Sequence, residues 1–192
     1  MAMAAASDRY TRVAVALHWL IALMVIGLIV FGLLMTKEWM PNRFAVYQLH
    51  KSFGIAVLVL SLGRLVWRLR HRPPPLPTAM PVWQIRISHA THWLFYGLLV
   101  AMPLLGWAMV SASTLPVPTL LFWLVPLPDL PGIGESEAAE AFFKDLHEIG
   151  AYLFIALIAL HIGAALKHQF VDRDGLLRRM SWRRSPAKAP RP

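Results

Sequence analysis

The sequence lacks cysteine at all of its 192 positions. This absence excludes disulfide bridges, thiolate metal sites, iron–sulfur clusters and the C-x-x-C-H attachment of a prosthetic group. Acidic residues are also scarce, with 10 Asp and Glu against 19 Lys and Arg, so the formal net charge is +9. Because no folded basic domain is visible that could carry nucleic-acid binding, we expect no nucleic-acid partner.

Long apolar runs occupy much of the chain, which is 57% hydrophobic with a mean hydropathy of +0.53. Four runs reach the length of about 20 residues that a membrane span requires: 13–35, 46–67, 87–110 and 146–167. The pattern predicts an all-α, integral membrane four-helix bundle over residues 1–180 and a basic, disordered tail over 181–192. The proline-rich link 111–145 is expected to cap one end of the bundle and to become helical from about Ser136.

Basic residues are divided unequally between the two ends of the predicted spans. Four crossings place both termini on one side, and 15 of the 19 Lys and Arg belong to that side. The other four, on the opposite side, are Lys37, Arg43, Lys51 and Lys144. The positive-inside rule therefore predicts cytoplasmic N- and C-termini. The basic surplus also predicts attraction to anionic membrane lipid.

Four of the eight histidines stand at matched depths within the spans. His18 and His161 lie near the cytoplasmic end, and His50 and His147 near the opposite end. His147 and His161 share one predicted helix. The rise between them along the helix axis is roughly 21 Å, and the rotation about the axis is about 40° short of whole turns, so both occupy one face. Imidazoles inside a span are costly and usually functional. Two pairs at two depths predict two bis-histidine haem groups, paired His18/His161 and His50/His147.

The residue four positions after each of these histidines gives a second test. A porphyrin lies flat against the helix that carries its ligand, so the residue one turn further on must be small. This residue is small after each of the four candidates: Ala22 after His18, Gly54 after His50, Ala151 after His147 and Ala165 after His161. It is large after the other two, Trp93 after His89 and Tyr96 after His92. This pattern favours the first four histidines as iron ligands and disfavours His89 and His92.

Basic residues near the ends of the spans are candidates for pairing with the anionic haem propionates. Arg64, Arg68 and Lys167 stand at a suitable depth on the cytoplasmic side, and Lys51 does so on the opposite side. A membrane stop signal explains the first three as well. His168, at the cytoplasmic edge, is a candidate quinone or propionate contact or simply a surface residue.

Other uses of intramembrane histidines stay open at this point. Such a residue can form a hydrogen bond to a neighbouring helix. Histidines can also carry protons in a small transporter, although the predicted spans supply no Asp or Glu in the membrane core to work with them. An all-histidine zinc site shared between the two depths is excluded by the roughly 21 Å between them.

Four segments carry a resemblance to a known family: RYTRVAVALHWL, QLHKSFGIAVLVLSLGRLVWRL, SHATHWLFYGLLVAMPLLGW and LHEIGAYLFIALIALHIGAALKHQFVDRDGLLRRM. They resemble the prokaryotic cytochrome b561 family. The resemblance implies a multi-pass protein of the bacterial inner membrane with two haem b groups that exchanges electrons with the quinone pool. The family's ligand positions fall on His18, His50, His147 and His161.

One branch of that family oxidises superoxide and reduces ubiquinone, and this chain resembles it in length and number of spans. The expected activity is therefore that of a superoxide:ubiquinone oxidoreductase, with superoxide or a periplasmic redox partner as electron donor. The alternative is a haem b electron-relay or anchor subunit of a multi-subunit dehydrogenase or hydrogenase.

Overall fold

The computed structural model describes residues 9–77, 80–115 and 117–182. Its four long helices are α1 (Arg12–Met35), α2 (Arg43–Arg70), α3 (Val82–Ser111) and α4 (Glu137–Lys167). All four are long and apolar enough to cross a membrane, which confirms the predicted all-α membrane bundle. The predicted disordered tail lies outside the described residues except for Ser181 and Trp182.

The helices extend beyond the predicted apolar runs because polar residues cap and continue them. Thr11 caps α1 by accepting a hydrogen bond from the amide of Ala14 at 3.2 Å. Ser136 caps α4 in the same way, from the amide of Ala139 at 3.3 Å. The link therefore becomes helical where the sequence predicted.

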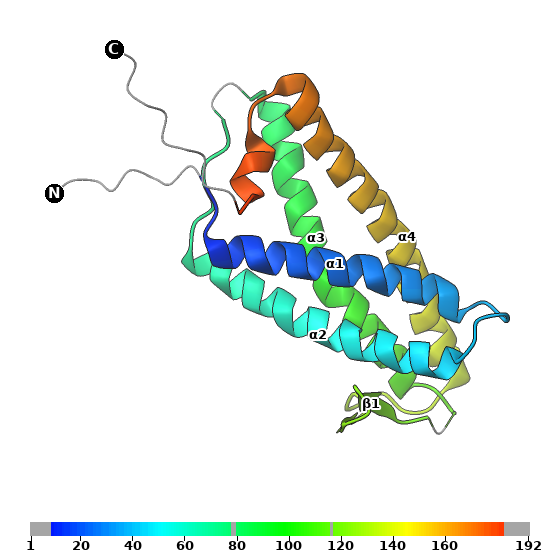
Figure 1. The fold of residues 1–192 in the computed structure, drawn as a ribbon. Helices are drawn as coiled ribbons and strands as arrows, with labels where there is room; N and C mark the ends of the chain where they lie inside the picture. The colour runs from blue at the N-terminus through cyan, green and yellow to red at the C-terminus, as the bar shows by residue number, and fades with distance from the viewer. Residues whose placement is uncertain (1–8, 78–79, 116, 183–192) are drawn as a thin grey trace, which may run out of the picture.

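The chain runs up and down through the bundle, and α2 packs against α1 and α3 while α3 packs against α4. The α1–α2 pair and the α3–α4 pair diverge toward the end at which the chain begins and ends (Figure 1). There Arg9 donates a hydrogen bond to the hydroxyl of Ser181 at 2.9 Å. We call this the terminal end. Two short turns lie beside it: η1 (His168–Asp172), a π-helix, and η2 (Leu176–Met180).

The opposite end carries the antiparallel hairpin of β1 (Thr119–Leu121) and β2 (Val125–Leu127), and we call it the hairpin end (Figure 1). Two buried side chains of α2 hold the hairpin. Ser52 accepts a hydrogen bond from the amide of Phe122 at 2.8 Å. Gln48 donates to the carbonyl of Pro118 at 3.0 Å. The link thus lies over one end of the bundle, anchored to the helix that carries His50.

The buried core is an apolar cluster in the middle of the bundle, formed by Ile21, Val25, Val57, Leu98, Leu99, Met102 and Phe154. On α4, Phe154 stands seven residues from both His147 and His161. The core therefore separates the two depths at which the histidines lie.

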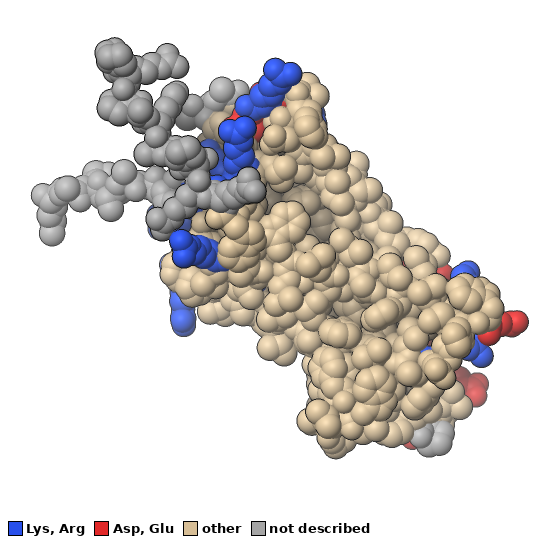
Figure 2. Space-filling model, viewed as in Figure 1, with Lys and Arg blue, Asp and Glu red and all other residues tan. Residues whose placement is uncertain are grey.

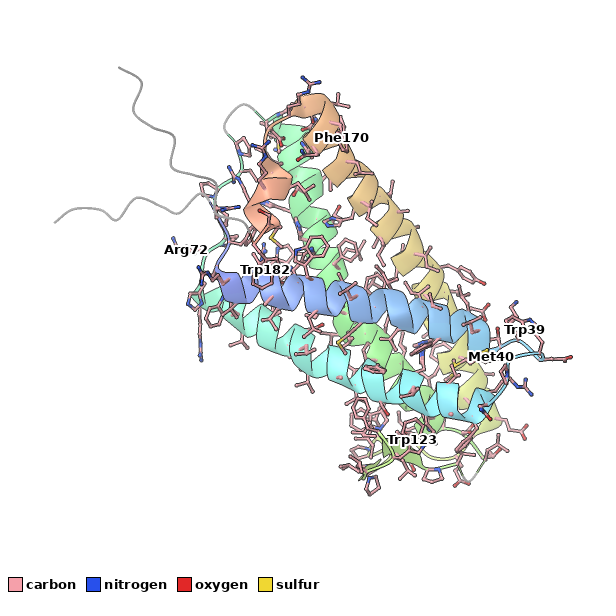
Figure 3. All side chains as sticks on the ribbon, viewed as in Figure 1. Trp39, Met40, Arg72, Trp123, Phe170 and Trp182 are labelled. Atoms are coloured by element: carbon pink, nitrogen blue, oxygen red, sulfur yellow. The ribbon has the colours of Figure 1, made fainter. Side chains whose placement is uncertain are left out.

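Apolar side chains also cover the outside of the bundle. Leu23 is 67% exposed, Val59 64% and Leu160 69%, as expected of residues that face lipid chains. Lys and Arg gather at the terminal end, whereas both signs of charge occur at the other end (Figure 2). Exposed tryptophans lie at both ends, Trp39 and Trp123 at one and Trp182 at the other (Figure 3). This distribution is typical of a membrane protein's two interfaces.

Candidate functional site

The four candidate histidines meet in two pairs. The imidazole centres of His50 on α2 and His147 on α4 are 6.2 Å apart, with an angle of 71° between the rings. The centres of His18 on α1 and His161 on α4 are 6.3 Å apart, at 70°. The bundle therefore brings together both pairs that the sequence predicted, with α4 contributing to each.

The spacing of each pair fits a single metal ion held between two rings. A metal–imidazole bond is about 2.0–2.1 Å, and the ring centre lies about 1.1 Å beyond the nitrogen. Two imidazoles that held one metal ion would therefore have ring centres at most about 6.3 Å apart, which agrees with both observed separations. Twisted ring planes are compatible with this arrangement, because both rings can share one axis through the metal.

At the hairpin end, α3 holds His147 by its Nδ1–Cε1 edge. The Nδ1 atom lies 3.1 Å from the carbonyl oxygen of Met102. A Cβ added at Gly106, one turn further along α3, would lie 3.3 Å from Cε1 and 3.5 Å from Nδ1 of His147. This contact leaves Nε2 as the nitrogen available to a metal, and the carbonyl bond fixes the proton on Nδ1.

His50 is held in a parallel way by α1. A Cβ at Gly32 would lie 3.4 Å from its Cε1 atom. Among the described residues, the buried Nδ1 of His50 has no hydrogen-bond partner of good geometry, and it interacts with the backbone of Leu28, four residues before Gly32. Met102 likewise precedes Gly106 by four residues. Each helix that contributes no histidine to this pair, α1 or α3, thus offers a glycine and the backbone group one turn before it to a histidine of a neighbouring helix.

A cavity of about 70 Å³ lies beside the hairpin-end pair, and its lining includes His50, Lys51, Gly54 and His147. A Cβ built on Gly54 would meet no other atom within 4 Å. Open space therefore lies one turn after His50, where the sequence predicted that a porphyrin needs a small residue. The paired imidazoles and the open position at Gly54 suit a haem, although the cavity itself is smaller than that group.

At the terminal end, Arg64 of α2 contacts His18, with 3.1 Å between Nη1 and Nδ1. A guanidinium only donates hydrogen bonds, so Nδ1 of His18 accepts here and Nε2 carries the proton. Iron ligation through Nε2 needs the opposite tautomer, with the proton on Nδ1. Haem binding at His18 therefore requires Arg64 to turn away.

His92 of α3 joins the terminal-end pair, which the sequence did not predict. Its ring centre lies 6.0 Å from that of His161, at 78°. Its Nδ1 atom lies 3.5 Å from the hydroxyl of Ser88. The bulky Tyr96, which is buried, stands one turn after it on the same helix. His92 is thus a third imidazole at this site.

The predicted propionate contacts lie close to the two pairs but have protein partners. Lys51 lies 3.4 Å from the carbonyl of Pro118 and 4.6 Å from the ring centre of Tyr47. The guanidinium of Arg68 lies 5.7 Å from the ring centre of Tyr96, and that of Arg64 lies 5.9 Å from it. The aromatic contacts place both arginines beside the terminal-end histidines.

The two predicted contacts at the end of α4 belong to a separate ionic cluster. The amino group of Lys167 lies 2.6 Å from the carboxylate of Asp172. Nδ1 of His168 lies 2.6 Å from Asp174 and 3.1 Å from Asp172. Both side chains are therefore engaged within the segment that follows the last span.

Comparison with known proteins assigns this chain to a family. The model of the prokaryotic cytochrome b561 family matches residues 9–183. The chain belongs to this family. Cytochrome b561 homologs 1 and 2 of Escherichia coli (strain K12) are 31% and 33% identical to it. The matches cover 92% and 90% of this chain, and 99% and 91% of the relatives.

A further cytochrome b561 relative is the Yersinia pestis protein named probable superoxide oxidase CybB. It is 28% identical over 175 residues, which are 90% of this chain and 95% of that protein. The cytochrome b561 chain described here is accordingly a membrane haem protein of the haem b class. Family and spans together make it a multi-pass protein of the bacterial inner membrane.

Proposed function

We propose that this cytochrome b561 holds two haem b groups, one between His18 and His161 and one between His50 and His147. The observation that carries the proposal is the presence of two ring pairs, 6.3 and 6.2 Å apart, at two depths of one bundle. Each haem, when bound, supplies a one-electron iron couple. The four histidines would supply ligand nitrogens, and the bundle would supply orientation and dry surroundings.

The helices are arranged to connect the two sites for electrons. His147 and His161 stand on the same helix, with a rise of roughly 21 Å between them. The buried apolar core, including Phe154 midway along α4, fills the space between the two depths. Such a core excludes water from the space between the two depths.

The orientation in the membrane follows from charge. Lys and Arg gather at the terminal end, and the positive-inside rule assigns that end to the cytoplasm. The hairpin end, with His50, His147 and the anchored hairpin, then faces the periplasm. An electron that entered there would have to cross the bundle to reach the cytoplasmic side.

The proposed reaction is the oxidation of superoxide by ubiquinone. Two superoxide anions each lose one electron and become dioxygen, and one ubiquinone gains both electrons and two protons to become ubiquinol. The name of the Yersinia pestis relative supports this donor. Lys51 supports it as well, because its ammonium lines the cavity beside His50 and His147 and attracts a small anion.

The terminal end offers groups for the quinone. His168 stands directly after α4, hydrogen-bonded to Asp174, and its side chain is 19% exposed. An imidazole paired with a carboxylate can donate a hydrogen bond and pass on a proton. We assign ubiquinone reduction to this end because its protons would come from the cytoplasm.

Haem stoichiometry tests the ligand assignment. Purified protein should contain two haems per chain by a pyridine haemochrome assay, and His50→Ala and His161→Ala should each contain one. A reduced-minus-oxidised spectrum without b-type haem would end the proposal, as would an unchanged haem content in His161→Ala.

Turnover tests the reaction separately. The isolated chain should reduce a soluble ubiquinone analogue when superoxide is generated, with two superoxide anions consumed per quinone. A chain that binds two haems but lacks this turnover would refute the proposed reaction without refuting the proposed haem ligands. A stoichiometric partner recovered after mild solubilisation would then identify an electron-relay subunit.

A further inference from the structure

The segment after α4 forms a pocket at the terminal end of the bundle. The π-helix η1 is followed by Arg173 and Gly175, both in the left-handed region with φ of 53° and 76°, and then by η2. The pocket has a volume of about 500 Å³, and its lining is Gln169, Phe170, Arg173, Asp174, Gly175 and Arg178. This volume is within the range of ligand-binding pockets.

The pocket is positively charged because its lining holds two arginines and one carboxylate, and that carboxylate already has other partners. Asp174 binds Nδ1 of His168 through one oxygen, at 2.6 Å, and the amide of Leu176 through the other, at 3.0 Å. Across the described parts of the chain, no carboxylate lies within ion-pair distance of Arg173 or Arg178. Arg173 donates only its Nε hydrogen, to the carbonyl of Phe170 at 3.3 Å.

Exposed apolar side chains adjoin the two arginines. Phe170 is 67% exposed and Val171 is 72% exposed, and both belong to η1, the last turn of the candidate membrane span Glu137–Asp172. Phe170 lies at the end of the bundle where Lys and Arg gather (Figures 2 and 3). The pocket thus combines two guanidinium groups with an apolar edge, at the end of the last candidate membrane span.

We propose that this pocket binds the phosphate group of an anionic glycerophospholipid. Arg173 and Arg178 bind the phosphate oxygens, since guanidinium groups suit phosphate geometry. Phe170 and Val171 pack against the acyl chains. A basic pocket at the membrane surface is the kind of site that recognises anionic headgroups.

The bound lipid would also act on the contacts between η2 and the segment that contains Arg9 and Trp19. The carbonyl of Arg178 accepts a hydrogen bond from Arg9 at 2.6 Å. The carbonyl of Met180 accepts one from Trp19, the residue after His18, at 2.9 Å. A lipid that orders η2 therefore orders the start of α1, where His18 stands.

Lipid binding by the haem-loaded protein in a neutral detergent tests the proposal. The probe is isotope-labelled phosphatidylglycerol, and the measurement is lipid retained per chain. Wild-type protein should bind about one molecule saturably, with at least tenfold preference over phosphatidylcholine. Arg173→Gln/Arg178→Gln should lower the affinity at least tenfold, and each single variant should lower it by a smaller factor. The control Arg70→Gln/Arg72→Gln removes two exposed charges at the same end and should stay within twofold.

Three results would overturn the assignment. The first is equal lipid affinity in the Arg173→Gln/Arg178→Gln variant and the wild type. The second is an equal loss in the control variant, which would indicate a diffuse charge effect. The third is displacement of the lipid by inorganic phosphate at the same concentration, which would indicate a site for free phosphate. The haem spectrum shows whether each variant is folded. If the double variant does not fold, the lipid affinities of the two single variants decide the test.

Discussion

Gly106 on α3 gives a direct test of how the hairpin-end histidines are positioned. A Cβ at this position would lie 3.3 Å from Cε1 of His147, closer than the usual carbon–carbon contact of about 3.5–4.0 Å. Valine adds two further carbons beside it. We expect Gly106→Val to push the imidazole away from α3 and to break its 3.1 Å contact with the carbonyl of Met102.

The magnitude follows from the cost of overpacking. Extra carbons in a packed site cost about 1–3 kcal/mol. Since each 1.4 kcal/mol is a factor of ten, haem affinity at the hairpin end should fall by about 5- to 140-fold. Gly106→Ala adds only the first carbon and should give an effect near the lower limit. The terminal-end site, formed by His18 and His161, should keep its haem.

Haem content and the reduced-minus-oxidised spectrum measure this effect. In Gly106→Val, haem per chain should fall from two toward one as the purified protein is diluted in detergent. Gly97→Val is the matched control, because Gly97 is on the same helix and a Cβ there would meet no atom within 4 Å. Two stably bound haems in Gly106→Val, or an equal loss in Gly97→Val, would refute the positioning role of Gly106.

Three further changes test other parts of the structure. His92→Ala should keep two haems per chain, because His18 and not His92 is the proposed partner of His161; loss of one haem in that variant would reverse the assignment. Ser52→Ala leaves the amide of Phe122 without its hydrogen bond and should lower the free energy of unfolding by about 1–3 kcal/mol. The midpoint of thermal unfolding should fall in this variant but not in the exposed control Gly63→Ala. Arg64→Gln removes a cation beside the terminal-end site, and potentiometric titration should show the midpoint of that site lower by on the order of 50–100 mV, at an effective dielectric constant of about 20.

The fold and the pairing of the histidines could be predicted from the sequence because a membrane makes depth a one-dimensional quantity. The depth of His18, His50, His147 and His161 along the membrane normal is set by where each residue stands within its apolar run. Only residues at equal depth can meet, so the pairing follows once the spans are located. The ligand roles themselves remain a prediction.

The terminal-end surroundings could not be predicted in this way. His92 was judged unfit from Tyr96, one turn further along its own helix, yet it lies 6.0 Å from His161. That judgement concerned one helix surface and contained no information on how α3 faces α4. The contact between Arg64 and His18 also depends on the packing of two helices, which depth does not determine.

Gly32 and Gly106 were overlooked, although the sequence contained a signal for them. Glycine weakens a helix by roughly 1 kcal/mol relative to alanine, so its presence in a span has a cost. Both glycines stand at the depth of the hairpin-end histidines, in the two helices that carry neither His50 nor His147. A search for small residues opposite each ligand, as well as one turn after it, would have found them.

The two sites differ in a way that gives electron flow a direction. At the hairpin end, the carbonyl of Met102 accepts a bond from Nδ1 of His147, which increases the electron donation of the imidazole and favours the oxidised iron. At the terminal end, the guanidinium groups of Arg64 and Arg68 both contact the ring of Tyr96, and positive charge beside the site favours the reduced iron. We therefore expect the terminal-end midpoint potential to be the higher one.

Electrons would then run downhill from the hairpin end to the terminal end, the direction that the oxidation of a periplasmic donor by ubiquinone requires. Single-site variants allow each potential to be measured separately. Gly106→Val should retain the terminal-end haem, and His161→Ala the hairpin-end haem. A higher midpoint potential in His161→Ala than in Gly106→Val would contradict this order, and the surrounding charges would then not set the direction of transfer.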